Sequence, residues 1–89
     1  MSIAIYPGTF DPVTNGHVDI VERASKTVDR LTVGVVEISS KRTMFTIDER
    51  ISMFTEAVTH VPNVSVESYS GLTVNAARQI GADVIVRGL

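Results

Sequence analysis

Short apolar runs alternate along this chain with segments whose apolar residues recur three and four positions apart. Runs rich in β-branched side chains predict buried strands, and they occupy residues 3–6, 31–36, 64–67 and 84–86. Spacing of three and four places apolar side chains on one side of a helix, and it occurs over residues 14–28, 46–58 and 71–80. We therefore predict four strands with a helix between each strand and the next.

Residues typical of helix ends support these three helices. Thr14 and Asn15 stand where the first helix begins, and either side chain can accept a hydrogen bond from its free N–H groups. Thr46 and Glu49 have the spacing of a capping box at the start of the second helix. Gly81 follows the third, and glycine readily takes the left-handed conformation that ends helices.

Alternation of strands and helices indicates a parallel sheet with right-handed crossovers. We predict an α/β fold, a Rossmann-like doubly wound parallel sheet with βαβαβαβ order and strand order 3-2-1-4. Such a sheet reverses between its first and fourth strands, and ligands bind there, beyond the carboxyl ends of the strands. Residues 8–10 and 87–88 would lie on the two sides of this crevice. One helix cannot cover the second face of the sheet, so we also expect an exposed apolar patch.

Composition limits the classes of function. With 89 residues the chain is at most one domain, residues 1–89. Apolar residues make up 44% and charged residues 20%, which is typical of globular rather than disordered chains. The net charge of −2 gives no general attraction for nucleic acid or an anionic membrane, and the absence of cysteine excludes disulfides and thiolate metal sites. Without a spanning apolar run or a secretory signal, the expected location is the cytoplasm.

Candidate chemistry is concentrated in residues 6–17, which read YPGTFDPVTNGH. Gly8 follows the first strand, and a glycine there lets the backbone approach a phosphate closely. His17 falls in the first turn of the next helix, where free N–H groups and the helix dipole favour anions. Each feature alone could be a solvated turn, but the whole run fits a site that stabilises charge on a phosphoryl group.

The remaining polar residues are less specific. Lys41 follows the second strand, in a loop of the kind that lines ligand crevices, although a solvated lysine is the alternative. Arg87 has a guanidinium that suits phosphate, although a frayed terminal residue is the alternative. We interpret His60 as a helix-end cap, and Asp48 with residues 49–50 as capping box and helix surface. No spacing of His, Asp and Glu indicates a dedicated metal site.

Residues 6–17 resemble a known signature. Thr14, Gly16 and His17 are similar to the T/H-x-G-H motif of the nucleotidyltransferase superfamily, and the longer run resembles the phosphopantetheine adenylyltransferase family in particular. The likeness continues over the whole chain at near-constant spacing, through residues 41, 44–46, 49–50, 71–72 and 87–89.

The resemblance implies a reaction. Members of that family transfer the adenylyl group of ATP to 4′-phosphopantetheine, giving dephospho-coenzyme A and pyrophosphate, with Mg²⁺ held largely by the ATP phosphates and water. The acceptor phosphate attacks the α-phosphorus directly, so catalysis depends on positioning and charge stabilisation. The resemblance also implies a homo-oligomer, a hexamer in the full-length family.

Residue roles on the ATP side follow by position. His17 would contact the ATP phosphates and stabilise the transition state, and Thr9 would bind both the nucleotide and the attacking phosphate. Phe10 and Gly88 would offer backbone groups to ATP.

Three further positions would bind 4′-phosphopantetheine together with Thr9. Lys41 would neutralise its phosphate and the developing charge, and Arg87 would bind that phosphate from the far side of the crevice. Thr73 stands where the family usually has an apolar residue, so a side-chain contact there would alter affinity.

Family members are almost twice as long as this chain, so we expect residues 1–89 to be an incomplete domain that stops before the fifth strand. Another nucleotidyltransferase, of the nicotinamide mononucleotide or glycerol-phosphate type, is one alternative, against which Lys41 and Arg87 argue. A non-catalytic nucleotide-binding or assembly module is the other.

Overall fold

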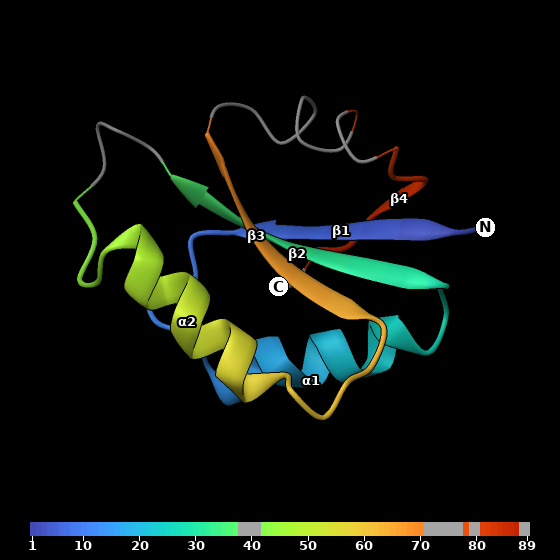
Figure 1. The fold of residues 1–89 in the computed structure, drawn as a ribbon, viewed down its shortest axis with the longest axis horizontal. Helices are drawn as coiled ribbons and strands as arrows, with labels where there is room; N and C mark the ends of the chain where they lie inside the picture. Colours follow the sequence, from blue (N-terminus) through green and yellow to red (C-terminus); the bar gives the residue numbers. More distant parts are fainter. Residues whose placement is uncertain (38–41, 71–77, 79–80, 88–89) are drawn as a thin grey trace.

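The computed structural model describes residues 1–37, 42–70, 78 and 81–87. It contains a four-stranded parallel sheet in the order β3-β2-β1-β4, which confirms the predicted fold class and strand order (Figure 1). The elements are β1 Ile3–Gly8, α1 Asn15–Ser25, β2 Arg30–Glu37, α2 Ile47–Ala57, β3 Val64–Ser70 and β4 Val84–Ile85.

Both described helices cover the same face of the sheet (Figure 1). Alternate residues of a strand point to opposite faces, so Ala4 and Tyr6 of β1 join the core under the helices, whereas Ile5 packs on the other face against Tyr69 and Ala82. The largest fully buried side chains are Phe54, Ile5, Leu31, Val21, Val33 and Val35. Burial on two faces explains why β1 and β2 are apolar runs rather than alternating patterns.

Element ends differ in detail from those predicted. β1 continues through Pro7 and Gly8 because it pairs with β2 as far as Val35, and β2 and β3 extend into polar residues because they pair with each other as far as Glu37. α1 ends at Ser25 rather than at Val28. There the backbone N–H and the hydroxyl of Thr27 both donate to the carbonyl of Ala24, at 3.0 and 2.8 Å. A side chain that bonds locally to the backbone competes with helix continuation.

Asn63 fixes the turn between α2 and β3 onto the end of α1. Its side-chain amide donates to the carbonyls of Ser25, Val28 and Asp29, at 2.8, 3.1 and 3.3 Å. One amide group thus binds a carbonyl at the end of α1 and two carbonyls of the segment that joins α1 to β2.

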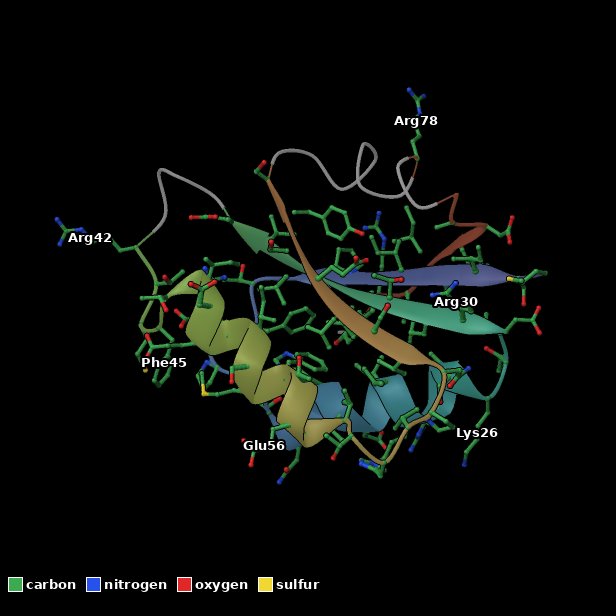
Figure 2. All side chains as sticks on the ribbon, viewed as in Figure 1. Lys26, Arg30, Arg42, Phe45, Glu56 and Arg78 are labelled. Carbon is green, nitrogen blue, oxygen red and sulfur yellow. The ribbon has the colours of Figure 1, made fainter. Side chains whose placement is uncertain are left out.

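The predicted third helix at residues 71–80 lies outside the described residues except for Arg78. Gly81, predicted as its stop, has φ of 68°, the left-handed conformation expected of a glycine in that role. On β4, Val84 and Ile85 are 48% and 36% exposed. Charged side chains such as those of Lys26, Arg42 and Arg78 extend away from the core (Figure 2). None of the described helices is long and apolar enough to cross a membrane.

Candidate functional site

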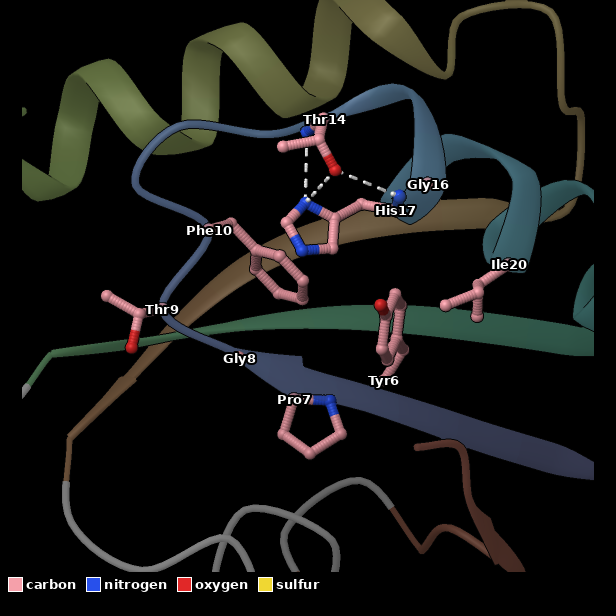
Figure 3. A pocket seen from close by; sticks show the side chains of 9 residues that line it. All are labelled: Tyr6, Pro7, Gly8, Thr9, Phe10, Thr14, Gly16, His17 and Ile20. Atoms are coloured by element: carbon pink, nitrogen blue, oxygen red, sulfur yellow. Dashed lines mark hydrogen bonds between the residues drawn. The ribbon is translucent and has the colours of Figure 1, made fainter. Parts of the chain in front are cut away.

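A pocket of about 430 Å³ opens where β1 ends and α1 begins (Figure 3). Its lining residues are Tyr6, Pro7, Gly8, Thr9, Phe10, Thr14, Gly16, His17 and Ile20. All belong to one continuous stretch of chain, and the pocket lies beyond the carboxyl end of β1, beside the strand-order reversal between β1 and β4. This is the place where ligands bind in doubly wound sheets.

His17 and Thr14 bind each other reciprocally at the start of α1 (Figure 3). The Thr14 hydroxyl accepts from the His17 N–H at 3.3 Å, and the Thr14 N–H donates to Nδ1 of the His17 ring at 2.9 Å. This is a capping box in which histidine stands where glutamate or glutamine is usual. The ring that lines the pocket is therefore also a capping group of the helix.

The reciprocal bond decides which ring nitrogen of His17 carries the proton. A backbone N–H can only donate, so Nδ1 must be the unprotonated nitrogen, and the neutral ring then carries its proton on Nε2. Burial also lowers the pKa of His17 from its ordinary 6.5, which favours the neutral ring. His17 thus holds an N–H donor on Nε2, the nitrogen that the helix cap leaves available.

Phe10 holds the loop above the pocket in an unusual conformation. Its φ is 49°, in the left-handed region that costs a non-glycine residue about 1–2 kcal/mol. Edge-to-face contacts fix the ring, with centroids 5.1 Å from Tyr6, 4.9 Å from His17 and 4.8 Å from Phe54. Gly8 allows this packing, because a Cβ there would lie 2.7 Å from the Phe10 ring.

Asp11 joins the pocket loop to the loop that precedes α2. Its carboxylate accepts hydrogen bonds from the backbone N–H groups of Met44 and Phe45, the latter at 2.8 Å. Charge-assisted bonds of this kind are stronger than neutral ones. The two loops at this edge of the sheet are therefore fixed to each other.

Arg50 was predicted to lie on the surface of α2, and that prediction is wrong. Only 3% of the residue is exposed, and its guanidinium donates to the carbonyls of Phe45, Thr9 and Val36, at 3.2, 3.0 and 3.2 Å. The signal was present in the sequence. Arg50 follows Ile47 by three positions and precedes Phe54 by four, which places it on the buried side of the helix.

Comparison with known proteins identifies the family. The cytidylyltransferase-like family model matches residues 5–89. The chain belongs to the cytidylyltransferase-like family.

Curated relatives share the name that the sequence resemblance suggested. Phosphopantetheine adenylyltransferase of Carboxydothermus hydrogenoformans is 48% identical over all 89 residues, and that of Heliobacterium modesticaldum is 53% identical over the same span. This chain covers 55% and 53% of these two proteins, so it spans about half the length of the curated relatives it matches.

Solved structures confirm the fold. The lipopolysaccharide core biosynthesis protein of Thermoplasma volcanium superposes with a TM-score of 0.73 at 22% identity, over 96% of this chain and 72% of that one. A bifunctional NMN adenylyltransferase/ADP ribose pyrophosphatase of Francisella tularensis superposes with a TM-score of 0.72 at 14% identity, over 94% and 31% of the two chains.

The cytidylyltransferase-like fold gathers part of the expected site. Thr9, Phe10 and His17 line one pocket. Arg87 is exposed and does not line that pocket. It comes directly after Val86, whose N–H donates to the carbonyl of Ile5 at 2.8 Å. Three further expected site residues lie outside the described residues: Lys41, Thr73 and Gly88.

Tyr6 lines the pocket, although the sequence pattern predicted no individual role for it within the run of residues 6–17. Only 3% of the residue is exposed, it lines the pocket with His17, and burial raises the pKa of its phenol. Its position near the end of β1, two residues before Gly8, was the available signal.

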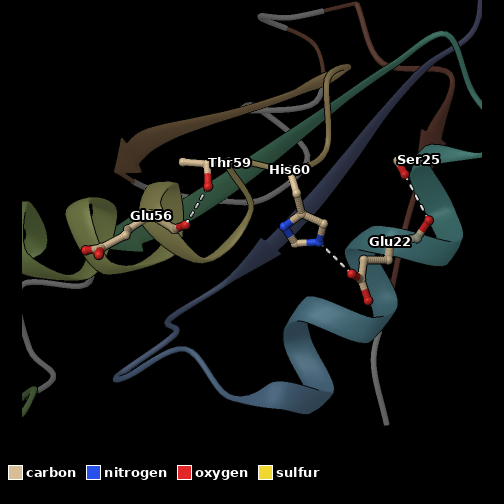
Figure 4. Close-up of polar contacts among 5 residues, drawn as sticks. All are labelled: Glu22, Ser25, Glu56, Thr59 and His60. Atoms are coloured by element: carbon tan, nitrogen blue, oxygen red, sulfur yellow. Dashed lines mark hydrogen bonds and ion pairs between the residues drawn. The ribbon is translucent and has the colours of Figure 1, made fainter.

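His60 does not cap a helix, contrary to the prediction. Its Nε2 lies 2.6 Å from a carboxylate oxygen of Glu22, so it links the end of α2 to α1 (Figure 4). Both side chains are about half exposed, at 54% and 43%. They line a second pocket of about 560 Å³, whose other residues come from α1 and the turn before β3. Within the described part of the chain, no group of three His, Cys, Asp or Glu residues could hold a metal ion.

Proposed function

We propose that this chain forms the nucleotide-binding half of an adenylyltransferase that moves the adenylyl group of ATP to 4′-phosphopantetheine. The observation that carries the proposal is the Nε2 donor of His17, fixed by Thr14 at the start of α1 inside the pocket. The names of the curated relatives support 4′-phosphopantetheine as acceptor.

The pocket suits a phosphate chain for three reasons. The first turn of α1 has free N–H groups and the positive end of the helix dipole. His17 adds an N–H donor on Nε2 and is neutral at neutral pH, because burial lowers its pKa. Gly8 and Gly16 keep side chains away from the opening. ATP would bring Mg²⁺ as its complex, because phosphates and water satisfy this ion well.

In the proposed reaction a phosphate oxygen of 4′-phosphopantetheine attacks the α-phosphorus of ATP. A new P–O bond forms while the bond from the α-phosphorus to the oxygen that bridges to the β-phosphorus breaks. Pyrophosphate leaves with that electron pair, and dephospho-coenzyme A remains. His17 would donate a hydrogen bond from Nε2 to the phosphate oxygens on which charge grows, and such donors typically contribute about 100- to 1,000-fold in rate.

The acceptor side of the site rests on expected contacts. Thr9 would bind the attacking phosphate together with Lys41 and Arg87, while Thr73 would face the pantetheine and Gly88 the ATP. We further propose that the complete protein is a cytoplasmic homo-oligomer, a hexamer, as the resemblance implies. Lys41 and Arg87 favour a phosphorylated acceptor, which is the feature that distinguishes this proposal from a nucleotide-binding module without catalysis.

Pyrophosphate release from the complete gene product tests the proposal. We expect release with MgATP and 4′-phosphopantetheine together, and none above background when nicotinamide mononucleotide replaces the acceptor or when CTP and glycerol phosphate replace both substrates. Release with one of those replacements, and none with 4′-phosphopantetheine, would contradict the assigned acceptor. For residues 1–89 alone we expect weak ATP binding and little or no turnover, and full rates from this chain would contradict that expectation.

A further inference from the structure

Arg50 carries a buried positive charge that the described structure leaves without an anionic partner. The residue is 3% exposed, and all three of its hydrogen bonds go to neutral carbonyl oxygens. The ion pairs of the described residues are Asp19–Arg23 and Glu22–His60, and neither includes it. Buried charges in proteins are normally paired, so this guanidinium calls for a functional explanation.

The three carbonyls that Arg50 binds come from three separate segments at one edge of the sheet. Thr9 follows β1, Val36 lies near the end of β2, and Phe45 precedes α2. Thr9 also lines the pocket, so the bond of 3.0 Å to its carbonyl places the charge beside a peptide group of the pocket lining.

The peptide that joins Thr9 to Phe10 transmits this contact. In a planar trans peptide the N–H points opposite to the C=O, so binding of the Thr9 carbonyl by Arg50 directs the Phe10 N–H away from Arg50. That N–H has no hydrogen-bond acceptor among the described residues. A donor bound to the carbonyl also polarises the peptide and strengthens its N–H as a donor.

We propose that Arg50 is a positioning residue for phosphate binding. It fixes the Thr9–Phe10 peptide so that the Phe10 N–H donates to a phosphate oxygen of the nucleotide, whose negative charge compensates the buried guanidinium. The left-handed φ of Phe10, 49°, is consistent with a peptide held in a required orientation. The proposal rests on the proposed function, because it takes a nucleotide phosphate as the ligand of this pocket.

Variants of the complete gene product test it. Arg50→Met removes the charge and every donor, whereas Arg50→Lys keeps the charge but not the planar fork. Val58→Ala serves as the stability control, since Val58 is a core residue just past the far end of the same helix, outside the pocket. For each variant, calorimetry gives the dissociation constants of MgATP and of adenosine, which has no phosphate.

We expect Arg50→Met to weaken MgATP binding by about 10- to 100-fold while adenosine binding stays within about twofold. Arg50→Lys should weaken MgATP binding by less than Arg50→Met does. If Arg50→Met does not fold, Arg50→Lys is measured in its place. Val58→Ala should lower the melting temperature without changing the affinity for MgATP relative to that for adenosine. The amide proton resonance of Phe10 should move upfield in both Arg50 variants but not in Val58→Ala.

Two outcomes would overturn the proposal, and they differ in scope. If the wild-type protein binds MgATP and the Arg50 variants bind it equally well, or lose ATP and adenosine affinity alike, Arg50 has no positioning role and the proposed function stands. If the wild-type protein binds no nucleotide, the proposed function fails and the role of Arg50 fails with it.

Discussion

The backbone N–H of Thr14 donates to Nδ1 of His17 at 2.9 Å, so the residue that caps α1 also sets the tautomer of the pocket histidine. A second hydrogen bond joins the same two residues: the His17 N–H donates to the Thr14 hydroxyl. Helix stability and the supply of a donor on Nε2 therefore depend on the same two residues. A substitution of His17 changes both, unless the new side chain can still complete the cap, whereas a substitution of Thr14 removes the hydroxyl contact and leaves its backbone N–H in place.

Glutamine at position 17 should separate these two roles. Its amide oxygen can accept from the Thr14 N–H, as glutamine does in ordinary capping boxes, so His17→Gln should keep the melting temperature within a few degrees. Turnover should fall, because the imidazole Nε2–H donor is replaced by an amide N–H on a more flexible side chain. His17→Ala should lose both the cap, about 1 kcal/mol of stability, and the turnover. Equal stability losses in the two variants, measured by thermal unfolding, would contradict the shared role.

The protonation state of His17 can be observed directly. Nitrogen-15 chemical shifts of the ring at pH 7.5 should show an unprotonated Nδ1 and a protonated Nε2. Burial lowers the pKa of His17 below 6.5, so titration should be centred below that pH. In Thr14→Val the backbone N–H of position 14 can still donate to Nδ1 of His17, but the hydroxyl contact with His17 is lost. Thr14→Ser keeps both contacts and is the matched control. A midpoint above 6.5 in the wild type would be inconsistent with this geometry.

The same pKa shift gives a pH dependence of stability. The unfolded chain binds more protons than the folded chain between the lowered pKa of His17 and the ordinary value of 6.5. The contribution of His17 to stability is therefore complete above pH 6.5 and is lost as the pH falls through the folded pKa. Chemical unfolding from pH 7.5 down to 5 should show this loss, and His17→Gln should reduce it.

Alanine substitutions at two glycines should have opposite effects on stability. A Cβ at Gly8 would lie 2.7 Å from the Phe10 ring, which three other aromatic rings hold in place, so Gly8→Ala should destabilise by about 1–3 kcal/mol. At Gly16, in the first turn of α1, the nearest atom would be 3.6 Å away. Gly16→Ala should therefore stabilise by up to about 1 kcal/mol. Urea unfolding of both variants provides the measurement.

The contact between His60 and Glu22 should contribute little to stability. Its side chains are 54% and 43% exposed, and pairs of such exposure are worth less than about 1 kcal/mol. A double-mutant cycle with His60→Gln and Glu22→Gln at pH 5.5 measures the coupling. The exposed Asp19–Arg23 pair on α1 is a matched comparison. A coupling several times larger than that of the comparison pair would point to a structural role for the second pocket.

Local sequence determined the elements of this protein. The capping residues Thr14 and Thr46 were predictable because a cap depends on a hydroxyl and residues up to three positions away. The strand order followed because apolar runs with helices between them permit few parallel arrangements. The pocket run was also recognisable, since Thr9, Phe10 and His17 lie within nine consecutive positions of a continuous loop and helix start.

Tertiary structure decided the contacts between distant segments. Arg50 binds Thr9, 41 positions away, and His60 binds Glu22, 38 positions away. Periodicity places Arg50 on the buried side of α2, but only the packed sheet supplies three carbonyls there to accept its hydrogen bonds. Side chains bind groups that are close in space. For segments separated in the sequence by a whole strand or helix, that proximity exists only after the sheet has formed.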